Sequence, residues 1–273
     1  MSSETRVRAA QLAPAALSPS LPKRVWRLLL LVLAAAAVVQ MGRDLDLAPG
    51  ALMKGTDKLA LFLGAMVPPT SGGMLVRIVK ALGETFAMAF AGTVLAAVTA
   101  LPLGVVGAKT IVRNPVAHFV FRRFLDLFRG VPALVWALIL VSAFGLGPFA
   151  GVVALALADI PHLAKLFAEA IENCDPKPAE GVRAAGAPPL AVMRYSLAPQ
   201  VTPVIASQCL FFLEGNFRSA AVLGIVGAGG IGFELEERIR IFAFDQAAFI
   251  ILLYMAGVAT LDLISRELRK RLA

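Results

Sequence analysis

Three polar side chains at the end of one apolar run are the best candidates for chemistry in this sequence. Glu214, Asn216 and Arg218 follow an apolar stretch that begins at Val201. Charged groups at membrane depth are costly, and they are usually either functional or paired. Arg218 could attract an anionic ligand at the outer mouth of a pathway through the membrane. Alternatively, Glu214 and Arg218 could form a structural pair, since they stand one helical turn apart.

A second polar set, Asp159, His162 and Lys165, lies beside a proline in another apolar run. It fits a kinked helix with satisfied polar groups at least as well as a ligand site. The rest of the chain offers no Ser/His/Asp triad, no paired carboxylates and no metal-ligand spacing. Cys174 and Cys209 are isolated from other ligand types. The sequence therefore predicts no catalytic residue and no metal site.

The sequence GAGGIG at 227–232 matches the G-x-G-x-x-G pattern of dinucleotide-binding proteins. That fingerprint requires a preceding strand, a helix and a βαβ unit, and none of these is indicated around it. A membrane-embedded enzyme that binds a nucleotide here is therefore a minor alternative. We expect Gly227, Gly229, Gly230 and Gly232 to let the backbone line a pore mouth. The simpler alternative is a flexible outer loop.

Composition indicates a membrane protein. The 273 residues are 59% hydrophobic and only 16% charged, with a mean hydropathy of +0.80. A soluble domain carries about a quarter charged residues. The net charge of +8 does not indicate nucleic-acid binding, because Lys and Arg flank the apolar runs. We predict an all-α polytopic membrane protein with about six transmembrane helices, in contact with the lipid bilayer.

The first third of the chain contains one predicted span. Residues 1–27 form a polar tail, and residues 28–41 form a first transmembrane anchor, although their length is also near that of a signal peptide. Residues 42–80 form an external segment. Within it, an amphipathic helix lies along the membrane or packs on the protein's outer face. The apolar side of that helix is formed by Leu52, Leu59, Leu63 and Met66.

Five further spans are predicted in residues 81–265, which form the membrane core of the chain. They cover residues 82–107, 131–144, 149–173, 201–217 and 244–264, and a basic tail follows at 266–273. When the N-terminus is placed inside, the inner segments hold about twice as many Lys and Arg residues as the outer ones. We therefore expect both termini, and the segment 175–199, in the cytoplasm.

The segment 180–199 is a soluble-looking insert with the pattern helix, sharp turn, helix. Pro178 suits a first helical turn, and Gly186 suits a left-handed helix end. Pro189 can open a second short helix, which we expect Pro199 to end. The small residues at the bend, Ala184, Ala185 and Gly186, would let another backbone approach. The insert is either a docking element or an ordinary polar loop.

The spacing in this insert resembles a known signature. Glu180, Gly186 and Pro199 stand where the EAA loop of binding-protein-dependent ABC importer permeases has E, G and P in E-A-A-x3-G-x9-I-x-L-P. Four positions depart from it: Gly181, Val182, Ser196 and Ala198. Several other segments are similar to the phosphonate-type permease subfamily: 81–107, 122–136, 145–151, 165–172 and 223–235.

The resemblance implies the MetI-like fold of a type I importer in the bacterial cytoplasmic (inner) membrane. Two permease subunits, usually a homodimer, would form the pathway, and two cytoplasmic ATPases would bind their EAA loops. A periplasmic or lipid-anchored binding protein would deliver phosphonate, phosphite, phosphate or a related oxyanion. ATP and Mg would belong to the ATPase, with no cofactor on this chain, which has no Walker A sequence. The chain would thus be a transport subunit and not an enzyme.

The resemblance also implies residue roles. Glu180 would cap or form a salt bridge at the ATPase interface, Arg183 would pair with an acid there or anchor the loop, and Gly186 would permit the bend. The glycines at 224–232 would form an outer gate or a surface for the binding protein, and Glu214, Asn216 and Arg218 would line the pathway. Alternatives are an importer for another small solute, or a secondary transporter without an ATPase.

Overall fold

The computed structural model describes residues 21–44, 49–111 and 114–272, and the regular structure in these ranges is all helical. The predicted all-α class is confirmed. The chain forms two units, residues 1–64 and residues 65–273, which are described separately. Most of the predicted N-terminal tail lies outside the described residues.

The first unit contains helices α3 (Leu21–Asp44) and α4 (Pro49–Ala65). Helix α3 covers the predicted anchor, and its stretch Val25–Arg43, 19 residues long, is apolar enough to cross a membrane. Helix α4 covers most of the predicted amphipathic helix but ends before Met66. Pro68 and Pro69 follow directly and cannot continue a helix. Including Met66 on that helix was therefore wrong, while its placement along a membrane stays a prediction.

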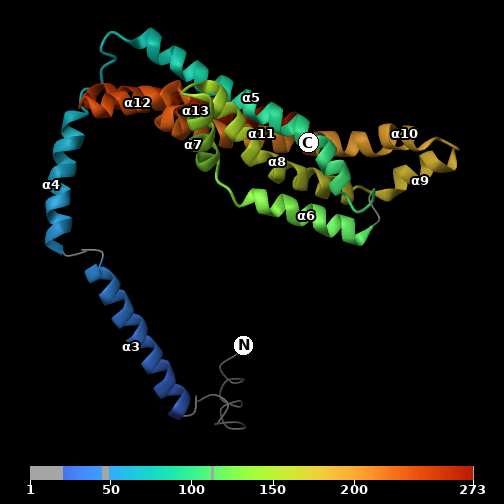
Figure 1. Cartoon of the computed structure of the whole chain (residues 1–273), viewed down its shortest axis with the longest axis horizontal. Coiled ribbons are helices and arrows are strands. Elements are labelled where there is room, and N and C mark those ends of the chain that lie inside the picture. Colours follow the sequence, from blue (N-terminus) through green and yellow to red (C-terminus); the bar gives the residue numbers. More distant parts are fainter. Residues whose placement is uncertain (1–20, 45–48, 112–113, 273) are drawn as a thin grey trace, which may run out of the picture. The chain divides into compact units, whose positions relative to one another are not determined.

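The second unit is built around helices α5 (Leu75–Gly107) and α8 (Pro148–Glu172), which lie side by side (Figure 1). Small residues, Gly92 and Gly104, allow this close packing. Gly92 lies against Leu155, and Gly104 lies against Phe167. The buried apolar side chains at this contact form the centre of the unit.

The predicted span at 131–144 differs in the structure. Helix α7 (Ala133–Phe144) has 12 residues, about 18 Å, which is too short to cross a bilayer alone. It follows helix α6 (Pro115–Arg129) after a 75° bend, and the length and composition of the pair fit either one broken span or a re-entrant loop. Pro132, with an extended backbone, separates the two helices. The described residues thus hold five candidate spans, or six with this pair.

The remaining elements are α9 (Pro176–Ala184), α10 (Pro189–Val192), the π-helical η1 (Met193–Leu197), α11 (Ala198–Leu223), the π-helical η2 (Gly224–Ala228), α12 (Gly230–Arg240) and α13 (Phe244–Leu272). The elements α10, η1, α11 and η2 form one stretch of 40 residues, Pro189–Ala228, here called the long helix, whose helical backbone is broken near its end at Gly227 (φ 99°). Figure 1 shows α9 and α10 at one end of this unit and α12 at the other.

The long helix corrects two predicted ends. Pro199 does not end a helix, because it stands in the first turn of α11 directly after the wide turn of η1. A shifted hydrogen-bond register at a π segment tolerates a residue without an N–H. The span expected to end at Phe217 runs on to Leu223. Asn216 and Arg218, which we expected just beyond the span, therefore lie inside a helix together with Glu214.

Candidate functional site

The 175–199 loop is a helical hairpin with a defined bend. Asp175 caps α9 by accepting a hydrogen bond from the backbone N–H of Lys177 at 3.0 Å. At the other end, Gly186 has a φ of 79°. Its N–H bonds the carbonyl of Arg183, and the next N–H bonds the carbonyl of Val182, which is the Schellman pattern. The left-handed bend predicted at Gly186 is confirmed.

The predicted contact residues of this loop all face outward. Glu180, Arg183, Ala184, Ala185, Gly186 and Pro199 are exposed. Glu180 and Arg183 also line a groove of about 660 Å³ between the hairpin and the ends of α5 and α8. Cys174 lies in the same groove, and burial raises the pKa of its thiol. The loop therefore offers a mixed-charge surface to another molecule.

Gln200 ties this loop to the long helix, and sequence reasoning missed it. Its side-chain oxygen accepts a hydrogen bond from the Asp175 N–H at 3.0 Å, and its amide nitrogen donates to the Ser196 carbonyl at 2.8 Å. Nearby, Glu172 accepts from the Lys109 N–H at 2.7 Å and from Arg122 at 2.9 Å. The base of the loop is thus held by hydrogen bonds to the helices on either side.

Within α11, Glu214 and Asn216 are buried. Arg269 of α13 donates a hydrogen bond to Glu214 at 2.6 Å, so Glu214 pairs there and not with Arg218. Asn216 donates to the hydroxyl of Thr93 at 2.9 Å and to the carboxylate of Asp159 at 2.5 Å. It therefore joins α11 to both α5 and α8.

Arg218 has a different environment. Its side chain is 50% exposed, and its Nη1 lies 3.5 Å from Oδ1 of Asp262 on α13. That buried oxygen accepts no hydrogen bond from any residue that the structure describes. The expected alternative, a Glu214–Arg218 pair, is thus replaced by two separate ion pairs between α11 and α13. The partners lie roughly 50 residues away in the sequence, so no helical spacing could reveal them.

The second polar set does not gather into one site. Asp159 bonds Asn216, and His162 shares a hydrogen bond at 3.0 Å with the carbonyl of Ala158, in its own helix. Lys165 donates to Asp126 of α6 at 3.2 Å. Each polar group has its own partner, which fits the predicted kinked helix with satisfied polar groups.

The glycine segment, residues 224–232, packs its backbone closely against neighbouring helices. A side chain at Gly230 would collide with Thr85, and one at Gly232 would collide with the carbonyl of Ala221. The Ile231 N–H donates to the Thr85 hydroxyl at 2.8 Å. Helical turns precede and follow the segment, so the strand that a dinucleotide fingerprint needs is not in front of it.

A charged cluster holds α12 beside this segment. Arg77 of α5 donates to Glu234 at 2.7 Å and to Glu237 at 2.8 Å. Arg238, which is buried, lies 3.4 Å from Glu234. By contrast, Glu236 and Arg240 form an ion pair whose arginine is exposed. The end of the unit around α12 is therefore fixed by both packing and buried charge.

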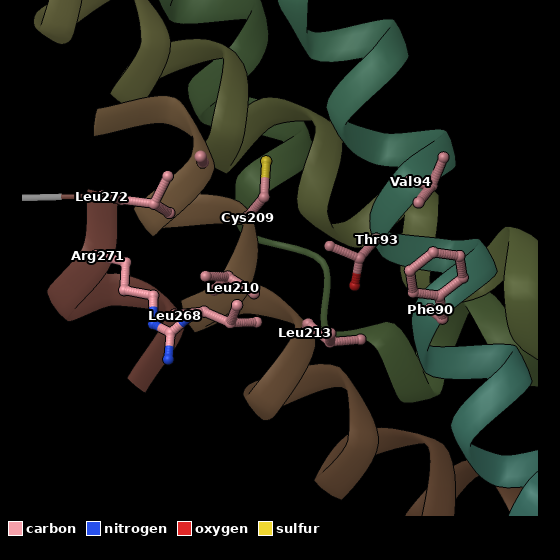
Figure 2. Close-up of a pocket in the computed structure, with 10 residues that line it drawn as sticks. Phe90, Thr93, Val94, Cys209, Leu210, Leu213, Leu268, Arg271 and Leu272 are labelled. Carbon is pink, nitrogen blue, oxygen red and sulfur yellow. The ribbon is translucent and has the colours of Figure 1, made fainter. Parts of the chain in front are cut away.

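Figure 2 shows a pocket of about 400 Å³ between α5, α11 and the last turn of α13. Its lining is almost entirely apolar, with Phe90, Leu213 and Leu268 among the contributors. The Thr93 hydroxyl already accepts a hydrogen bond from Asn216, and Arg271 lies within 3.5 Å of Glu267. The pocket therefore offers little to bind a charged solute.

Relatives of this chain are transport permeases. It is 41% identical over 219 residues to the phosphite transport system permease protein PtxC of Stutzerimonas stutzeri, covering 80% of this chain and 79% of that one. It is 35% identical over 207 residues to the phosphate-import permease protein PhnE of Mycolicibacterium smegmatis, covering 76% of this chain and 39% of that one.

Solved structures agree on the fold. The inward-facing MetNI methionine ABC transporter matches with a TM-score of 0.65 at 24% identity, over 75% of this chain and 100% of that one. The predicted type I importer fold is thereby confirmed. The profile described as "Binding-protein-dependent transport system inner membrane component" matches residues 100–273. This chain belongs to that family of membrane permease components.

Proposed function

We propose that this chain forms the translocation pathway of an ATP-driven importer for phosphonate or a related oxyanion such as phosphite or phosphate. The permeases PtxC and PhnE, named for phosphite and phosphate, support this substrate class. Its partners are a second permease subunit, in a homodimer, two cytoplasmic ATPases that bind ATP and Mg, and a binding protein outside. The protein lies in the inner membrane of a bacterium, with both of its termini in the cytoplasm.

The single observation that carries the mechanism is the long helix. It begins in the exposed 175–199 loop and ends in the packed glycine segment. Helical turns run without a break from Met193 to Val226, so a displacement of the loop by the ATPases is carried along them to the glycine segment, where Gly227, with a φ of 99°, ends the helical backbone. Gln200 ties the loop to this helix, so α9 moves with it.

In this mechanism, Glu180 and Arg183 contact the ATPase, and the bend at Gly186 sets the direction of α9. The glycine segment gates the outer side or meets the binding protein. Conformational change requires ligands that bind the two states differently, and ATP and the loaded binding protein supply that difference. The chain itself binds no nucleotide.

The test is ATP hydrolysis by the complete complex reconstituted in liposomes. The binding protein is added empty or loaded with phosphite, phosphate or methylphosphonate. Stimulation by at least one loaded form, with ATP-dependent uptake of the same ion, is expected. Uptake without an ATPase subunit would instead indicate a secondary transporter, and stimulation only by an unrelated solute would refute the substrate class.

A further inference from the structure

The guanidinium of Arg218 has hydrogen-bonding capacity that the structure does not use. Arg77, Arg122 and Arg269 each donate a hydrogen bond to a carboxylate, at 2.7, 2.9 and 2.6 Å. Among the residues that the structure describes, Arg218 has one ion pair, with Asp262 at 3.5 Å, and no hydrogen bond to a carboxylate. A guanidinium carries five N–H donors, and they match the oxygens of a carboxylate or a phosphate-like group in pairs.

Arg218 also lies deep in the membrane-spanning part of the unit. Asn216 bonds Thr93 and Asp159, and these two residues stand close to the middles of α5 and α8. Arg218 is two residues further along α11, a rise of about 3 Å. A rotation of about 200° around the axis separates it from Asn216. Asn216 therefore faces the packed helices, and Arg218 faces the opposite side.

That opposite side is an open face of α11. Exposed side chains recur along it at helical spacing on both sides of Arg218: Val204, Phe211, Val222 and Ile225. A charged group at this depth is rarely turned toward lipid and normally faces a water-filled cavity or the interior of a bundle. The open face of α11 therefore fits the wall of the translocation pathway.

We propose that Arg218 is a transit site for the oxyanion, with Asp262 as its resting counter-charge. When a tetrahedral oxyanion arrives, the guanidinium donates two parallel N–H···O bonds to it. When the ion leaves, Arg218 returns to the ion pair with Asp262. This competition keeps binding weak enough for release, which passage through a membrane pathway requires. The proposal rests on the proposed function and names the residue that contacts its substrate.

Arg269, whose partner Glu214 lies one helical turn before Arg218 on α11, is less suited to this role. Arg269 is only 26% exposed at its side chain and donates a 2.6 Å hydrogen bond to Glu214, which is buried. If Arg269 left Glu214 to bind an anion, the buried carboxylate of Glu214 would lose its partner, and an unpaired buried charge strongly destabilises a fold. Asp262 is more accessible, at 27% against 9% for Glu214, and its contact with Arg218 is longer.

The test compares Arg218→Gln, Asp262→Asn and the double variant in the reconstituted complex with its ATPase and binding protein. Uptake of phosphite, phosphate and methylphosphonate is measured. Loss of charge-assisted hydrogen bonds predicts uptake lowered about tenfold or more in Arg218→Gln. Asp262→Asn should keep or increase uptake, and the double variant should stay as low as Arg218→Gln. If the pair were only structural, Asp262→Asn would be defective and the double variant would recover.

A conservative variant and a second readout separate this proposal from the proposed function. Arg218→Lys keeps the charge but loses the paired donors, so its uptake should fall between wild type and Arg218→Gln. ATP hydrolysis stimulated by the loaded binding protein should persist in both. Near-normal uptake in both variants would overturn the transit site alone. A wild-type complex without ATP-dependent oxyanion uptake would overturn the proposed function.

Discussion

The two ends of the long helix meet different demands with the same residue type. At the loop end, Gly186 has a φ of 79° and no atom within 4 Å of where a side chain would begin. Just beyond the other end, in the first turn of α12, Gly232 has no such conformation but lies against the carbonyl of Ala221. Gly186 is needed because its backbone is left-handed, and Gly232 is needed because there is no room for a side chain.

This difference distinguishes a surface that is available to a partner protein from a contact that packs helices within the chain. The residues around Gly186 are exposed and make few contacts within the chain, so their side chains remain available to a partner. Gly232 itself and its neighbours Ile231 and Glu234 are buried, and α12 is held there by Arg77. Substitutions at the loop end should therefore impair transport in a folded protein, whereas those at the outer end should impair folding itself.

The largest effect is expected for Gly232→Ala. One added methyl group would overlap the Ala221 carbonyl, and such overpacking against backbone costs about 3 kcal/mol or more. Thermal unfolding of the purified protein measures this loss. The matched control is Gly181→Ala in α9, where nothing lies within 4 Å and alanine favours the helix by about 0.5–1 kcal/mol. Equal stability of the two variants would refute the packing account.

Gly186→Leu tests the loop end. A left-handed conformation costs a side-chain-bearing residue about 1–2 kcal/mol, so the bend changes while the rest of the unit stays folded. We expect loss of uptake and of stimulated ATP hydrolysis at nearly unchanged thermal stability. Gly186→Asn is the control, because asparagine tolerates this conformation. Transport that stays intact in Gly186→Leu would remove the coupling role from this bend.

Asn216→Leu tests the connection midway between the two ends. It removes the hydrogen bonds to Thr93 and Asp159, and unsatisfied buried polar groups cost about 1–3 kcal/mol. The unfolding temperature should fall. Thr260→Val serves as the control, since it removes only a hydrogen bond to its own helix at an exposed site. No difference between these variants would mean that Asn216 does not hold the three helices together.

Arg240→Ala should have the smallest effect. Its partner is Glu236, one turn away, and the arginine side chain is 77% exposed. Exposed ion pairs contribute roughly 0–1 kcal/mol. Chemical denaturation in detergent should therefore give almost the wild-type midpoint. A large destabilisation would show that the exposed side of α12 also supports the fold, which would contradict the view that buried contacts hold this helix.

Local sequence patterns predicted the parts of this structure that depend on local chemistry. The bend at Gly186 follows from a glycine that stands between two helix starts marked by prolines. Long-range partners could not be predicted in this way. Arg269 and Asp262 come from α13, and only packing brings them to Glu214 and Arg218.

The ends of α11 were missed for a related reason. Polar residues at 214–218 suggested that the span was over, because unpaired charges are excluded from lipid. In the fold, Glu214 and Asn216 have partners in neighbouring helices, so the helix continues. This extension moves Arg218 from the expected outer mouth to the interior of the span.

The central claim is that the long helix carries motion of the 175–199 loop to the outer end, and one distance measurement tests it. Arg240→Cys, in a chain with Cys174 and Cys209 replaced by Ser, places one spin label on α12 of each copy in the proposed homodimer. ATP and loaded binding protein should shift the label-to-label distance in the parent complex and leave it unchanged when Gly186→Leu is added. The same shift in both complexes would contradict the claim.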